Sequence, residues 1–140
     1  MKATRAMLLS FLVVVFAAAA QTEPVAPTTM SGNIISKTGA ANARVWTLTI
    51  TNNGPAAANS LQMNSFNLTQ TAGAACTPVI TPPSTLPLNL GGLAPGGSTV
   101  VDMTIDFTGC AANARFTAMF TFSANDGAVT GTVVRYNQFR

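Results

Sequence analysis

Apolar and polar residues alternate along much of the chain beyond residue 30. Trp46, Leu48 and Ile50 share one parity, with threonines between them. The same period of two returns in two later stretches, residues 101–107 and 116–122. Because successive side chains of a β-strand point to opposite faces, this period predicts strands with one buried face. We therefore expect a core that includes Trp46, Ile50, Val101, Ile105, Phe116 and Phe120.

The pattern changes parity once inside a predicted strand. Leu61 and Met63 share one parity, whereas Phe66 and Leu68 share the other. A β-bulge near residues 64–65 would restore a single buried face, because a bulge inserts one extra residue into a strand. Further strands are expected at residues 32–38, 61–69, 76–80, 86–90 and 129–136.

Turn signals separate these stretches. Asn52-Asn53-Gly54-Pro55 ends the first of them, and Asn125-Asp126-Gly127 is typical of a hairpin turn. Gly91-Gly92 and Pro95-Gly96-Gly97 are expected to frame another turn. Pro87 places its strand at a sheet edge, because proline donates no ladder hydrogen bond. Seven or eight strands about 8–15 residues apart predict an all-β, Ig-like Greek-key β-sandwich.

The first twenty residues have a different pattern, which is typical of a secretory signal peptide. Lys2 and Arg5 precede an apolar run at residues 7–16, and four alanines follow at 17–20. The run is shorter than the ~20 residues of a membrane-spanning helix, so an uncleaved anchor is the weaker alternative. We expect cleavage after Ala20 and no stable membrane insertion of the mature protein.

This interpretation divides the chain into a signal peptide (1–20), a flexible leader (21–30) and one β-sandwich domain (31–140). The mature protein is then secreted, at the cell surface or extracellular, with the periplasm left open as an alternative.

Charge is scarce in the mature chain. Seven Lys and Arg and four Asp and Glu give a net charge of +3, and removal of Lys2 and Arg5 leaves five against four, or +1. No basic patch with interleaved aromatic residues remains, so a nucleic-acid partner is not expected. Nineteen threonines and eleven asparagines beyond residue 20 supply the polarity instead. Threonine favours strands and asparagine favours turns, which agrees with the all-β prediction.

Cys76 and Cys110 are the two cysteines. An exported chain meets an oxidising environment, so we expect a disulfide between them, worth about 3–4 kcal/mol in the chain-entropy model. A reactive thiol or a metal site is the alternative. Both lack support, because there is no CxxC pair and no histidine.

Little in the chain is suited to catalysis. The absence of histidine excludes a Ser-His-Asp triad. Asp102, Asp106 and Asp126 would have to converge to bind calcium, but the first two lie at outward positions of a predicted strand. Lys37 would need a neighbouring asparagine and a buried acid to form an isopeptide bond. We expect a protein that is not an enzyme and that has no metal and no cofactor.

Two aromatic residues and one sequon raise the question of sugars. Trp46 and Tyr136 would suit a sugar-binding platform, but the parity of Trp46 favours the core. Asn67-Leu68-Thr69 matches a glycosylation sequon, which we interpret as strand polarity.

Two segments carry a family resemblance. VWTLTITNNGP at residues 45–55 and LGGLAPGGSTVVDMTIDF at residues 90–107 resemble the DUF11 and CARDB-like domains, which are Ig-like modules of bacterial secreted proteins. The resemblance covers about residues 31–135. It implies a structural, adhesive or spacer role at the cell surface.

The sequence therefore favours a secreted, non-enzymatic structural or adhesive protein that acts through protein–protein contact with itself or with other surface proteins. A carbohydrate- or surface-binding module is the alternative. In one form of self-assembly, residues 24–36 would pair with the sheet edge of a neighbouring molecule, with Val25, Met30, Ile34 and Ile35 as apolar contacts. Alternatively, Ile34 and Ile35 belong to an ordinary first strand of their own domain.

Overall fold

The computed structural model describes residues 28–140, so the predicted signal peptide and most of the leader, Val25 included, lie outside the described residues. Within them the chain forms eight β-strands and one short 3-10 helix, η1. In chain order the elements are β1 (Met30–Thr38), η1 (Ala41–Ala43), β2 (Arg44–Asn52), β3 (Ala58–Ala72), β4 (Val79–Thr81), β5 (Leu88–Leu93), β6 (Ser98–Asp106), β7 (Arg115–Ala124) and β8 (Val129–Phe139).

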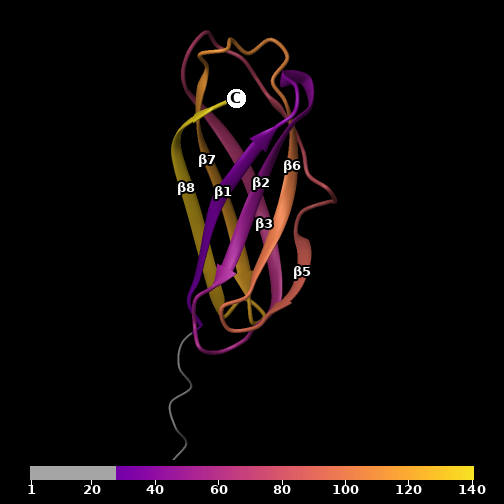
Figure 1. Cartoon of the computed structure of the whole chain (residues 1–140), viewed down its shortest axis with the longest axis vertical. Helices are drawn as coiled ribbons and strands as arrows, with labels where there is room; N and C mark the ends of the chain where they lie inside the picture. The colour runs from indigo at the N-terminus through magenta and orange to yellow at the C-terminus, as the bar shows by residue number, and fades with distance from the viewer. Residues whose placement is uncertain (1–27) are drawn as a thin grey trace, which may run out of the picture.

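The strands form two antiparallel four-stranded sheets that pack face to face (Figure 1). One sheet has the order β1-β2-β6-β4 and the other β5-β3-β7-β8. The central pairs, β2 with β6 and β3 with β7, join strands that are distant in sequence, and the β2–β3 and β6–β7 connections cross between the sheets. This is the Greek-key arrangement of Ig-like sandwiches, so the predicted fold class is confirmed.

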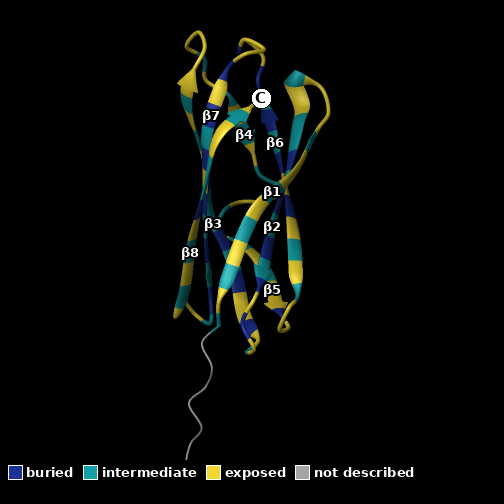
Figure 2. Cartoon of the chain, turned by 60° about the vertical axis from the view of Figure 1, so that its left-hand side comes forward, coloured by how far each residue is buried: buried dark blue, intermediate teal, exposed yellow. Residues whose placement is uncertain are grey.

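The core lies between the sheets and contains the residues whose alternating positions predicted burial. Trp46, Ile105 and Phe116 are fully buried, and buried and exposed residues alternate along the central strands (Figure 2). Trp46 is the centre of an aromatic cluster, with ring centroids 6.3 Å from Phe66 and 5.8 Å from Phe107. Such contacts stabilise a core beyond the burial of their area.

The predicted bulge in β3 is confirmed. Its pairing with β7 shifts between Met63 and Ser65, and Leu61, Met63 and Phe66 are all buried as a result. β5 is an edge strand, as Pro87 predicted. The first strand begins at Met30, two residues earlier than expected and at the last position of the predicted leader.

Two local predictions were wrong. The strand expected at 76–80 begins only at Val79, since Pro78 precedes it and Cys76 lies in the loop. Gly91-Gly92 lies within β5 and not in a turn. Gly91 has φ of +78° at a register shift opposite Leu61, so its conformational freedom serves a bulge.

Each end of the sandwich is fastened in its own way. At the disulfide end, which carries the C-terminus, Cys76 is bonded to Cys110 with their Cα atoms 5.2 Å apart, as predicted (Figure 1). At the opposite end, β2 finishes at Asn52, the only buried polar residue of the described chain. We call this the Asn52 end. Within residues 28–140 no helix is long and apolar enough to cross a membrane.

Candidate functional site

β1 and β8 are edge strands of different sheets, and they lie side by side along one side of the sandwich (Figure 1). Arg135 of β8 donates hydrogen bonds to the side chain of Asn33 (2.8 Å) and the carbonyl of Gly32 (2.6 Å). Lys37 of β1 donates to the main-chain oxygen of Phe139 at 3.0 Å. Two free sheet edges are thus joined by side chains along one side of the molecule.

Both edges carry features that oppose the addition of another strand. The β1 ladder shifts register between Ile34 and Ser36, and the β8 ladder shifts where Tyr136 and Asn137 stand opposite a single residue of β7. Lys37 is paired with Trp46, and Arg135 with the buried Ala118, so both cations lie on the inner faces. Bulges and inward charges are how native sheets protect free edges.

Beside the β8 edge, the outer face of its sheet carries a patch of large apolar side chains. Val134 is paired with Met119, and Phe139 is paired with Arg115. The two residues of each pair lie on the same face of the sheet, which here is the outer face. Tyr136 is the most exposed large apolar residue described, at 71 %, and Phe139 is 49 % exposed. We call Met119, Val134, Tyr136 and Phe139 the β8 patch. Ile35 is also exposed, on the edge strand β1 of the other sheet.

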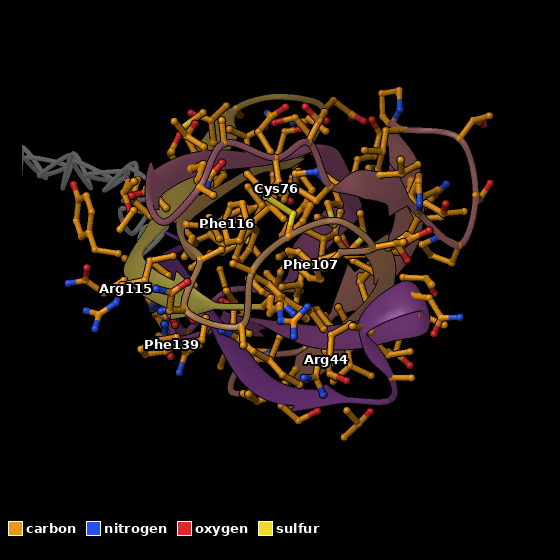
Figure 3. The ribbon with its side chains drawn as sticks, turned by 90° about the horizontal axis from the view of Figure 1, so that it is seen from above. Arg44, Cys76, Phe107, Arg115, Phe116 and Phe139 are labelled. Carbon is orange, nitrogen blue, oxygen red and sulfur yellow. A yellow bond between two sulfur atoms is a disulfide. The ribbon has the colours of Figure 1, made fainter. Side chains whose placement is uncertain are left out.

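Four cations gather at the disulfide end, around the last residues of β8. We call Lys37, Arg44, Arg115 and Arg140 the cationic end (Figure 3 labels Arg44, Arg115 and Phe139). Arg140 donates to the carbonyl of Cys110 at 2.7 Å, and Arg44 donates to the carbonyl of Gly39 at 2.6 Å. The Arg115 guanidinium lies 4.6 Å from the centre of the Phe139 ring.

Lys37 lies near another cation at this end. Its Nζ lies 4.0 Å from the centre of the Trp46 ring. Burial, and then the nearby charge of Arg44, lowers the pKa of Lys37 to about 8. Lys37 donates its hydrogen bond to the main-chain oxygen of Phe139. An isopeptide bond would instead need the side chain of an asparagine and a neighbouring acid at this position.

The three described acids do not converge. Asp102 accepts from the Thr47 hydroxyl at 2.7 Å on the outer face of its sheet, and Asp126 lies in the hairpin at the Asn52 end. Hydrogen bonds from Thr108 lower the pKa of Asp106. Within residues 28–140, His, Cys, Asp and Glu form no group of three that would suit a metal ion, and no pocket is found.

The described strand-donor residues, Met30, Ile34 and Ile35, lie within their own domain in the single chain described, and Val25 lies outside the described residues. Met30 and Ile34 are half-buried on the inner face of β1 and pack on the core, whereas Ile35 is exposed at the bulge. β1 pairs with β2 along its length, as expected for an ordinary first strand. Trp46 is fully buried, so of the two proposed platform residues only Tyr136 is on the surface.

Sequence reasoning did not identify Arg115, Arg135 or Phe139 as site residues. Arg135 had a signal, because it shares the parity of Val133, an inward residue of β8. The contact of Arg115 with Phe139 had none, since the two residues are far apart in sequence and meet only through the pairing of β7 with β8.

No family model matches this chain, and no curated protein and no solved structure matches it. The described residues therefore define an eight-stranded, two-sheet sandwich, without assignment to a family.

Proposed function

We propose that the chain is a secreted, non-enzymatic structural or adhesive surface protein that acts through protein–protein contact. The observation that supports this most is the β8 patch. Exposed aromatic residues and methionine are enriched in the centres of protein interfaces. Tyr136 and Phe139 stand out on a surface in which threonine, serine and asparagine supply most of the polarity.

Two further observations support an extracytoplasmic setting and an Ig-like module of the DUF11 or CARDB-like kind. The Cys76–Cys110 disulfide agrees with an oxidising compartment, as the proposed signal peptide requires. The TNNGP and LAPGGS motifs meet in space, because the main-chain N–H of Asn52 donates to the Gly97 carbonyl at 2.9 Å. The two resembling segments thus form one structural unit.

A second copy of the chain is the partner we propose for the β8 patch. The test measures the mass of the mature protein, residues 21–140, by light scattering over a wide range of concentration. We expect association that Tyr136→Ser weakens. Val100→Ser is the matched control, because Val100 is also exposed, at 57 %, but lies on the outer face of the other sheet. A strictly monomeric protein at every concentration would contradict self-association.

Strand donation remains a distinct form of self-assembly. The edges of β1 and β8 are protected, but β4 pairs only with Thr104–Asp106, so among residues 28–140 the preceding part of β6 has no partner on that side. A donated segment 24–36 would add there. Deletion of residues 21–38 tests this: loss of assembly from a domain that still folds supports donation, and assembly that persists contradicts it.

Carbohydrate binding is the second candidate function. It is favoured by the exposure of two aromatic rings, Tyr136 and Phe139, on one strand. Titration with neutral oligosaccharides, with Tyr136→Ser as the comparison, distinguishes it from protein contact.

A further inference from the structure

We infer that the cationic end binds an acidic polysaccharide, a polymer of sugars that carry carboxylates, and that this contact holds the secreted protein at a surface. This inference goes beyond the proposed self-association, and it shares Tyr136 and Phe139 with the β8 patch. It rests on the distribution of charge, on the hydrogen-bond partners of the four cations, and on the state of Arg115.

Cations, but not acids, are concentrated at one end of the sandwich, since Asp102 lies in the middle of β6 and Asp106 at its last position. The described residues contain five cations and three acids, a difference of +2. Four of the five cations form the cationic end, and the fifth, Arg135, lies on β8 before the end of the strand. Asp126 lies at the Asn52 end. Asp106 ends β6 near Arg44, but its outward parity is opposite to that of Arg44, and it accepts hydrogen bonds from Thr108.

The fold itself does not require positive charge at this end. Lys37, Arg44 and Arg140 donate to main-chain oxygens, and a neutral glutamine or asparagine donor would satisfy these acceptors equally. The crowding is unfavourable, because Lys37 is desolvated and lies near the charge of Arg44. Like charges kept together in a protein with so few charges indicate attraction to an anion outside the chain.

Arg115 differs from the other cations of this end, because its guanidinium lies on an aromatic ring and not on a main-chain oxygen. It makes no hydrogen bond to any described residue, and its guanidinium is held over the Phe139 ring. A guanidinium recognises a carboxylate through two parallel hydrogen bonds, and its orientation by an aromatic ring reduces the entropy lost on binding. Arg115 is therefore prepared to receive a carboxylate.

The neighbouring side chains favour a sugar polymer as the carrier of that carboxylate. Tyr136 and Phe139 present exposed rings next to Arg115 along β8, and Tyr136 adds a hydroxyl. An amphipathic ring suits a sugar, which has one apolar face and a polar rim. Lys37 and Arg44 lie on the inner faces and not on the outer face that carries Arg115, so they would attract successive acidic sugars through the field of their charges.

The experiment measures retention of the mature protein on immobilised polygalacturonate, with dextran as the neutral control polymer. We expect retention by polygalacturonate alone, which weakens as salt is added because screening shortens the reach of the charges. Arg115→Gln removes the free cation without removing a structural hydrogen bond. It should weaken binding by about fivefold to tenfold, the range of one charge-assisted contact at a surface.

A matched variant separates a site from a net-charge effect. Asp126→Asn raises the net charge by one at the opposite end of β7, and asparagine tolerates the positive φ of +54° at that position. A localised site leaves the affinity of Asp126→Asn unchanged. If Asp126→Asn strengthens binding as much as Arg115→Gln weakens it, the cationic end is not a site and the inference is wrong.

Two other outcomes would also overturn the inference. One is the absence of retention on polygalacturonate at low salt. The other is retention on anionic phospholipid vesicles without retention on polygalacturonate, which would assign the charge to a membrane surface. The light-scattering mass of Arg115→Gln keeps the two proposals distinct, since loss of polysaccharide binding with unchanged self-association leaves the proposed function intact.

Discussion

Replacement of Asn52 by alanine is the sharpest test of how the two resembling motifs hold the fold together. The Asn52 side chain is fully buried. Its amide nitrogen donates to the carbonyl of Ala56 at 2.8 Å and to those of Leu93 and Ala94 at 3.3 Å. Its oxygen accepts from the Gly54 amide at 3.0 Å. One side chain thus satisfies main-chain groups in two loops.

The magnitude follows from these contacts. The two 3.3 Å contacts share one amide hydrogen, so three hydrogen bonds are lost in Asn52→Ala. A buried main-chain group left without a partner costs about 1–3 kcal/mol, and water reaching the Ala56 side of the loop reduces this cost. The Gly54 amide keeps the Thr29 carbonyl at 3.1 Å, and the Ala94 carbonyl keeps the Gly97 amide at 2.9 Å. The carbonyls of Ala56 and Leu93 are the groups that lose the Asn52 donor, so we expect the free energy of unfolding to fall by about 2–3 kcal/mol, a large part of the stability of a small domain.

Asn53→Ala is the matched control, because it makes the same chemical change at the next position. Asn53 is exposed and donates one side-chain hydrogen bond, to the Ser31 hydroxyl at 2.8 Å. A single exposed contact of this kind contributes about 0.5 kcal/mol or less.

Urea denaturation followed by fluorescence measures both variants, since Trp46 is the only tryptophan and is buried in the core. The reasoning is refuted if Asn52→Ala loses less than about 1 kcal/mol, or if it matches Asn53→Ala, because buried unpaired groups must cost more than exposed ones. Hydrogen exchange gives a second readout: the Gly54 amide, which also donates to the Thr29 carbonyl at 3.1 Å, should lose part of its protection in Asn52→Ala and keep it in Asn53→Ala.

Four further predictions address the core, the disulfide, Lys37 and the N-terminus. Phe120→Ala should lower the free energy of unfolding by about 3–5 kcal/mol, and Thr121→Ala, its outward neighbour, by less than about 1 kcal/mol in the same urea melts; similar losses would mean that the assigned strand faces are wrong. The double variant Cys76→Ala/Cys110→Ala should lose about 3 kcal/mol, and reductant should destabilise the parent protein but not the variant. Because the pKa of Lys37 falls from 10.5 to about 8 on folding, the unfolded state holds the extra proton between these values, so stability relative to Lys37→Met should rise as the pH increases from about 8 to 10.5. Lys37 is only half-buried and solvent screens it, so the rise should be about 1 kcal/mol or less, and a fall over this range would contradict the assigned shift. N-terminal mass spectrometry of secreted protein should find Gln21 as the first residue, whereas retention of Met1 would show that the signal peptide is not cleaved.

Parts of the fold were readable from local sequence because the pleat of a strand is local. The alternation around Trp46 and around Phe120 assigned each side chain to a face without knowledge of its neighbours. The same reasoning located the bulge at residues 64–65, since one inserted residue is the simplest way for a continuous strand to change parity. The pairing of Cys76 with Cys110 needed only the count of cysteines and an oxidising environment.

Glycine and proline were less informative because one residue type serves several conformations. Gly91 was expected in a turn, yet its positive φ is used for a bulge inside β5. The choice depends on whether a partner strand lies alongside, and β3 provides that partner. Pro78 limited β4 in the same way, by removing a donor that the expected strand would have used.

The candidate sites depended on tertiary structure. Arg115 meets Phe139 because β7 and β8 pair, and Lys37 reaches the main-chain oxygen of Phe139 because edge strands of different sheets lie side by side. Asn52 was expected to mark a turn, but its burial follows from the approach of the Leu93–Ala94 carbonyls across the sandwich. The sequence alone thus determined which face each residue takes, since this follows from the geometry of one strand. Which residues gather into a patch, a cationic end or a buried hydrogen-bond centre was decided by packing between strands distant in sequence, which no local pattern encodes.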